Sequence, residues 1–152
     1  MFITPHTSVA IWISTRIGDP LWAFFFGVIS HFILDIIPHG DDNIADHKKD
    51  KKEKLLYLMR IAFADVFLAS LLLYFFISNG PAVDYWVLFG AVLGAWLPDM
   101  AWITIEMFRL HTLYWYVVLH SKLHNFFNWQ YSPVYGVPFQ IFFTLLMLRF
   151  SF

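Results

Sequence analysis

The chain has 152 residues, of which 59% are hydrophobic and 14% are charged, and it contains 18 Phe, 7 Trp and 7 Tyr. Soluble domains carry about 25% charged residues, so a fold of this size has more apolar surface than its own core can bury. The net charge of −1 argues against a nucleic-acid partner, and the lack of cysteine excludes disulfides, thiolate ligands and cysteine nucleophiles. We therefore predict a single integral membrane domain whose main partner is the lipid bilayer.

Helix signals occur along the whole chain, and no segment has the pattern of a strand. Thr4 and Pro5 fit the cap and the first position of a helix, which is short, so we expect it to enter the membrane only in part. The turn at 18–20 separates it from an apolar segment that stops at Pro38. We expect an all-α bundle of five to six transmembrane helices, at residues 4–17, 21–37, 55–78, 85–108, 112–129 and 139–150.

Small residues gather in the predicted helix at 85–108. They are Gly90, Ala91, Gly94 and Ala95. Side chains this small let two helix backbones approach closely inside a membrane. We therefore expect a neighbouring helix to pack tightly against this segment.

Residues 39–54 form the only strongly polar stretch of the sequence. Its lysines are Lys48, Lys49, Lys51, Lys52 and Lys54. Loops rich in Lys and Arg are retained on the cytoplasmic side of a membrane. We predict that this loop is cytoplasmic, and we take the lysines as a sign of orientation rather than of activity.

Four predicted helices carry an ionisable side chain at a similar depth. If residues 38–54 are cytoplasmic and the spans alternate, a rise of about 1.5 Å per residue puts these side chains roughly 10 to 16 Å from that side. They are His31, Asp65, Asp99 and His120. Ionisable groups inside a membrane are costly, usually face the interior of a bundle and usually mark function.

The spacing of these residues favours a metal site. His31 and Asp35 are separated by one helical turn, as are His120 and His124, so each pair shares a helix face. Imidazole nitrogens and carboxylate oxygens suit Zn²⁺ or Mn²⁺. The predicted metal ligands are His6, His31, Asp35, His39, Asp99, His120 and His124. The loop residues Asp41 and Asp42 are either outer ligands or ordinary loop carboxylates.

Asp65 lies at mid-span with apolar residues on both sides, and we predict that it acts as a general base that is not bound to the metal. Two alternatives stay open. The same groups could relay protons or bind a cation in a transporter, or they could only hydrogen-bond the helices of a non-catalytic scaffold. The sequence has no Ser-x-x-Lys, Gly-x-Ser-x-Gly or nucleotide-binding glycine motif, which disfavours covalent serine chemistry and nucleotide use.

The segments "TPH", "HFILDIIPH", "GAWLPDM" and "HSKLH" resemble those of small bacterial inner-membrane proteins described as membrane-bound metal-dependent hydrolases, among them the LexA-binding, inner-membrane-associated hydrolase family. The resemblance implies that His6 is the early histidine, Asp99 the aspartate of a Leu-Pro-Asp step, and His120 with His124 the late histidine pair. Two departures stand out. Residues 100–102 replace Ile-Asp-His, and three residues rather than four separate the late histidines.

The spacing of His31 and Asp35 is also similar to that in zinc-dependent phospholipases C and in nucleases related to them. This second resemblance implies hydrolysis of a phosphoester at a polynuclear metal centre, with metal-activated water as the nucleophile. For a protein of the bacterial inner membrane, a lipid-like phosphoester or another amphiphile is then the expected substrate.

Overall fold

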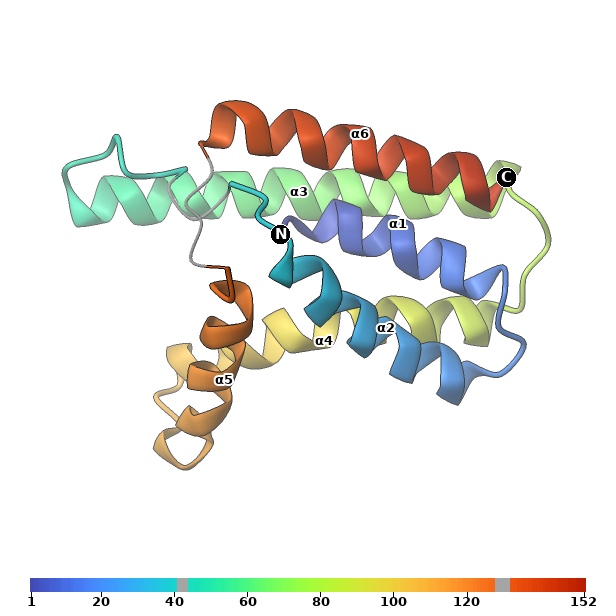
Figure 1. Ribbon diagram of the computed structural model, residues 1–152, viewed down its shortest axis with the longest axis horizontal. Helices are drawn as coiled ribbons and strands as arrows, with labels where there is room; N and C mark the ends of the chain where they lie inside the picture. The colour runs from blue at the N-terminus through green and yellow to red at the C-terminus, as the bar shows by residue number, and fades with distance from the viewer. Residues whose placement is uncertain (41–43, 128–131) are drawn as a thin grey trace.

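The computed structural model describes residues 1–40, 44–127 and 132–152. These residues form helices and no strand, as the sequence predicts, and the predicted outer ligands Asp41 and Asp42 lie outside them. The helices are α1 (Ile3–Ser14), α2 (Pro20–Ile36), α3 (Lys51–Asn79), α4 (Tyr85–Met107), the short 3-10 helix η1 (His111–Leu113), α5 (Tyr114–His124) and α6 (Pro133–Ser151) (Figure 1).

Capping residues explain why two helices begin earlier than predicted. The Asp50 carboxylate accepts hydrogen bonds from the amides of Lys52 and Glu53, so α3 begins inside the predicted polar loop. Ser132 accepts from the amide of Val134, and a proline at the first position lets α6 begin at Pro133 instead of residue 139. At the other extreme, α5 ends at His124, earlier than the predicted end at residue 129, which lies outside the described residues.

In the described part of the chain, three helices are long and apolar enough to cross a membrane, namely α3, α4 and α6. The helix α2 is apolar but shorter, and α1 and α5 are shorter still. The structure thus agrees with a membrane protein, while the predicted number of five to six spans is not confirmed.

The helix α1 lies inside the molecule and is not one of these spans. It lies between α3 and α6 on one side and α2 and α4 on the other, and it contacts all four (Figure 1). Its polar residues His6, Thr7 and Ser8 are fully buried. The hydroxyls donate to carbonyl oxygens one turn earlier, and Thr7 also accepts a hydrogen bond from the indole of Trp96. These two hydroxyl groups are tolerated inside the protein because their hydrogen bonds are satisfied there.

The helices α2 and α4 are in backbone contact, which confirms the close approach predicted from the small residues of α4. A Cβ atom on Gly94 would lie 2.1 Å from the carbonyl oxygen of Phe24, and one on Gly27 would lie 2.4 Å from that of Ala91. No side chain fits in these gaps. This contact fixes the position of the α2 histidine and aspartate relative to α4.

Candidate metal centre

Three helices bring four of the predicted ligands together. His31 and Asp35 come from the same face of α2, Asp99 from α4 and His120 from α5. One donor atom of each residue lies within 4.8 Å of the donor atoms of the other three. Of the side chains, those of His31, Asp35 and His120 are at most 6% exposed, while that of Asp99 is 23% exposed. The set is therefore buried and opens outward at Asp99.

The donor atoms of this group point at one another without forming hydrogen bonds. Nε2 of His31 lies 3.0 Å from Oδ2 of Asp35 and 3.6 Å from Oδ1 of Asp99. Nε2 of His120 lies 3.3 Å from Oδ1 of Asp99 and 3.8 Å from Oδ2 of Asp35. Nε2 of both histidines and Oδ2 of Asp35 are buried and have no hydrogen-bond partner. Unpaired buried polar atoms are rare and need a physical reason.

The tautomer of His31 supplies that reason. Its Nδ1 lies 2.7 Å from the carbonyl oxygen of Ala95, which can only accept, so Nδ1 carries the proton. In the neutral ring, Nε2 then directs a lone pair at two carboxylate oxygens, and acceptors that face one another repel. A cation among them would remove this repulsion, and a histidine held by a backbone carbonyl is the usual arrangement of a metal ligand.

A second group of donors adjoins the first and shares Asp35 with it. It consists of Asp35, His39 and His124, again with donor atoms within 4.8 Å of one another. The Nε2 atoms of His39 and His124 are 3.2 Å apart. The amino group of Met1 donates to Oδ1 of Asp35 at 2.8 Å and lies 3.4 Å from Nε2 of His124.

His6 contacts the centre but belongs to neither group. Its Nε2 donates to Oδ1 of Asp35 at 3.1 Å, and its ring stacks on that of His31 with 4.2 Å between the ring centroids. In the described structure, His6 therefore orients the Asp35 carboxylate. Its predicted role as a ligand stays a prediction.

Asp65, the predicted general base, accepts hydrogen bonds at the start of α1. Its carboxylate accepts from the amides of Ile3 and Thr4 and, at 2.6 Å, from the hydroxyl of Thr4. A carboxylate that caps a helix in this way stabilises the free backbone amides and the positive end of the helix dipole. Asp65 is outside both donor groups, although it lines the same cavity as Asp99 and His120.

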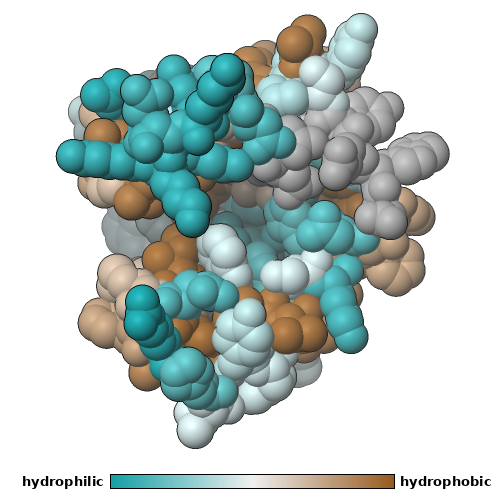
Figure 2. All heavy atoms as spheres, turned by 90° about the vertical axis from the view of Figure 1, so that its left-hand side faces the viewer, coloured by the Kyte–Doolittle hydropathy of each residue, from teal (hydrophilic) through white to brown (hydrophobic). Residues whose placement is uncertain are grey.

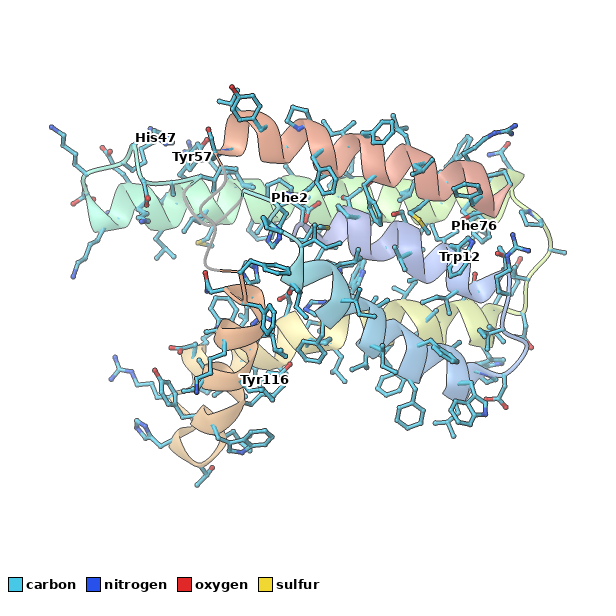
Figure 3. The ribbon with its side chains drawn as sticks, viewed as in Figure 1. Phe2, Trp12, His47, Tyr57, Phe76 and Tyr116 are labelled. Carbon is cyan, nitrogen blue, oxygen red and sulfur yellow. The ribbon has the colours of Figure 1, made fainter. Side chains whose placement is uncertain are left out.

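Sequence reasoning missed three residues that position the ligands. Gln140 donates to the carbonyl oxygen of His39 at 2.8 Å, and a glutamine in an apolar spanning helix is the signal that could have revealed it. Trp102 stacks on the His120 ring. The hydroxyl of Tyr116, on α5, donates to the carbonyl oxygen of Pro98 at 3.0 Å and so ties α5 to α4 beside Asp99 (Figure 3). Burial, and then the negative charges of Asp99 and Asp35, raise the pKa of Tyr116 to about 12, so this hydroxyl keeps its proton.

A cavity of about 640 Å³ lies next to the centre, between α3 on one side and α4 and α5 on the other. Figure 2 shows that the end of the molecule with the start of α3 and α5 is hollowed and that hydrophilic side chains gather above the hollow. The cavity walls are mainly apolar and include Leu58, Met59, Trp102 and Ile103. Its polar lining comprises Asp65, Asp99, His120, Ser121, His124 and Asn125. An amphiphile would find apolar walls and the donor cluster in one space.

The fold and the donor cluster together define the class of protein. The described residues form an all-helical protein in which three helices could cross a membrane and in which buried histidines and aspartates could hold a metal ion. Comparisons of the chain with protein-family models, with curated proteins and with solved structures gave no match. The family resemblance seen in the sequence, and the function that it implies, therefore stay predictions.

Proposed function

We propose that this protein is a membrane-bound, metal-dependent hydrolase that cleaves an amphiphilic ester, with a lipid-like phosphoester as the favoured substrate. The observation that carries the proposal is the set of unpaired, buried donor atoms of His31, Asp35 and His120 beside an apolar cavity. A scaffold that only links helices would join such atoms by hydrogen bonds, because polar groups without hydrogen bonds in a low-dielectric interior are costly.

The residues of the first group fit Zn²⁺ or Mn²⁺. Two imidazoles and two carboxylates offer four donors; a catalytic zinc site uses three protein ligands and water, and Zn²⁺ can expand to five ligands. When bound, such an ion polarises a phosphoryl oxygen and lowers the pKa of a coordinated water molecule to about 7. The donor set has the two negative charges of Asp35 and Asp99, which a divalent cation balances. The exposed side of Asp99 faces the cavity, so substrate can reach the centre from there.

The cavity favours an apolar substrate tail. Burial of a methylene group contributes about 0.8 kcal/mol, so a chain seated against Leu58, Met59 and Ile103 would bind much more tightly than a short analogue.

The roles of the remaining polar groups follow from their contacts. Trp102 and Tyr116 hold His120 and α5 in place, His6 orients Asp35, and Asp65 is the candidate general base in the same cavity.

Hydrolysis by the purified protein in detergent tests this proposal. We expect phosphatidylglycerol in mixed micelles to be cleaved in the presence of Zn²⁺ or Mn²⁺, cleavage to stop on chelation, and bis(p-nitrophenyl) phosphate to react more slowly because it lacks the apolar tail. His120→Ala should abolish the activity, while His47→Ala should not, because His47 packs on Tyr57 away from the centre (Figure 3). A metal-loaded protein that cleaves no ester but carries cations into liposomes would instead be a transporter.

Asp65→Asn separates the two roles of that carboxylate in the same assay. If Asp65 only caps α1, the variant should lose about 0.5–2 kcal/mol of stability and keep its activity at temperatures where it is folded. If Asp65 is the general base, the folded variant should lose about 10²–10⁴-fold in rate. Metal content should not change in either case, because Asp65 lies outside both donor groups.

We also propose that the protein lies in the bacterial inner membrane with the lysine-rich segment 48–54 in the cytoplasm and with α2 completing the bundle of spans. The lysines of this segment lie around the start of α3, where the positive-inside rule predicts the cytoplasmic end. Since the sequence has no cysteine, a single Lys49→Cys substitution reports this orientation directly. An impermeant maleimide should label Lys49→Cys only after the cells are permeabilised. Labelling of intact spheroplasts would show that the segment lies on the opposite side of the membrane.

A further inference from the structure

We propose that the centre holds two metal ions that share the Asp35 carboxylate, the first among His31, Asp99 and His120 and the second at His39 and His124. The inference rests on the proposed metal-dependent function for its first ion, but it does not require that the protein hydrolyse anything. It assigns a role to His39 and His124, which form the second donor group together with Asp35.

The Asp35 carboxylate faces two sets of groups with its two oxygens. Oδ2 lies toward His31 and His120, at 3.0 Å and 3.8 Å from their Nε2 atoms. Oδ1 lies toward His6 and the amino group of Met1. Asp35 is 1% exposed and is the one residue common to both donor groups of the described structure. A carboxylate placed in this way can bind one ion with each oxygen.

His39 is held in the orientation of a ligand. Its Nδ1 lies 2.6 Å from the carbonyl oxygen of Ile37, which can only accept, so the proton is on Nδ1 and the lone pair of the neutral ring is on Nε2. Its own carbonyl oxygen accepts from Gln140 at 2.8 Å. The backbone also fits closely against α6, where a Cβ on Gly136 would lie 2.1 Å from the His39 carbonyl oxygen. This much fixation around a loop histidine is typical of a ligand and its supporting contacts.

The second group already surrounds a positive charge. The Nε2 atoms of His39 and His124 face each other at 3.2 Å, and the Met1 ammonium lies between His124 and Asp35. Asp35, His39 and His124 therefore offer a cation one carboxylate oxygen and two imidazole nitrogens as donors, and a metal ion bound there would take the place of the Met1 ammonium. With the first group alongside it, the arrangement has the composition of a two-metal site, in which two ions clamp the attacking and leaving oxygens of a phosphoester.

Metal counting on the purified protein tests the inference with Zn²⁺ or Mn²⁺ alone as the probe. After equilibrium dialysis and elemental analysis, the natural protein should hold two ions per chain. His124→Ala and His39→Ala should each hold one, His120→Ala should also hold one, and Asp35→Asn should hold none. The control His111→Ala, altered in the exposed 3-10 helix, should hold two. One ion in the natural protein, or two in His124→Ala, would overturn the inference.

A variant that replaces no ligand guards against the direct loss of a ligand or misfolding as the cause. Gln140→Met keeps a side chain of similar size but removes the donor to the His39 carbonyl oxygen and the acceptor for the Phe2 amide. We expect the second ion to bind about 10–100-fold more weakly, the usual effect of losing a supporting contact, while the first ion stays bound. Equal weakening of both ions would contradict the assignment.

Two bound ions without any hydrolysis would refute the proposed function alone, whereas hydrolysis with one ion bound would refute only the second site.

Discussion

Asp99→Asn is expected to leave the metal-free protein at least as stable as the natural one, while removing most of the stabilisation that Zn²⁺ or Mn²⁺ provides. In the metal-free state, two carboxylates share one buried cluster, and their donor atoms face the unpaired nitrogens of His31 and His120. An amide of the same shape removes one charge that is costly to bury, and its NH2 group can donate to the Nε2 lone pair of His120, which lies 3.3 Å from Asp99.

The effect on metal binding has the opposite sign. A ligand present at 100 times its Kd stabilises a fold by about 2.7 kcal/mol, and a variant that has lost a ligand should show a small fraction of this value. Melting curves in detergent, with chelator and with added metal, measure both effects. Asp84→Asn is the matched control, because Asp84 caps α4 far from the centre and asparagine caps equally well. The same metal-induced shift in Asp99→Asn and in the natural protein would contradict the assignment of Asp99 as a ligand.

The sequence predicts that these side chains lie close together because helical periodicity acts over short distances. One turn separates His31 from Asp35, so the two had to share a face once α2 was helical. The small residues of α4 likewise permit a close neighbouring helix, and that neighbour is α2, whose Phe24 contacts Gly94. Burial of Asp99 and His120 beside this pair follows from the cost of an isolated charge in hydrocarbon.

Other features depend on contacts between distant parts of the chain, which periodicity does not describe. The Asp65 carboxylate accepts hydrogen bonds from Ile3 and Thr4, which precede it by 62 and 61 positions in the sequence. Its role as a cap of α1 therefore has no local signal. For the same reason, the short segment at 4–17 is predicted to enter the membrane in part, whereas the structure surrounds α1 with four helices. The orientation of His39 depends on Gln140, 101 residues later.

Gly94→Ala is expected to destabilise the protein strongly, although glycine-to-alanine changes normally favour a helix by about 1 kcal/mol. The added Cβ would lie 2.1 Å from the carbonyl oxygen of Phe24, and 3.0 Å and 3.1 Å from its carbonyl carbon and Cα. Backbone atoms cannot rotate away as a side chain can, so α2 and α4 must separate along their contact. Overpacking of this kind typically costs about 1–3 kcal/mol, and sometimes more.

The same separation should weaken metal binding at a distance from the substitution. The hydrogen bond from His31 to Ala95 lies one residue from Gly94, and it sets the tautomer and direction of the ligand. We therefore expect metal affinity to fall at least about 10-fold, as for the loss of a supporting contact. Gly18→Ala is the matched control, because a Cβ there meets nothing within 4 Å. Melting temperature and metal titration in detergent measure both effects, and a Gly94→Ala protein that melts higher than Gly18→Ala and binds metal normally would show that the α2–α4 contact does not hold the donor cluster together.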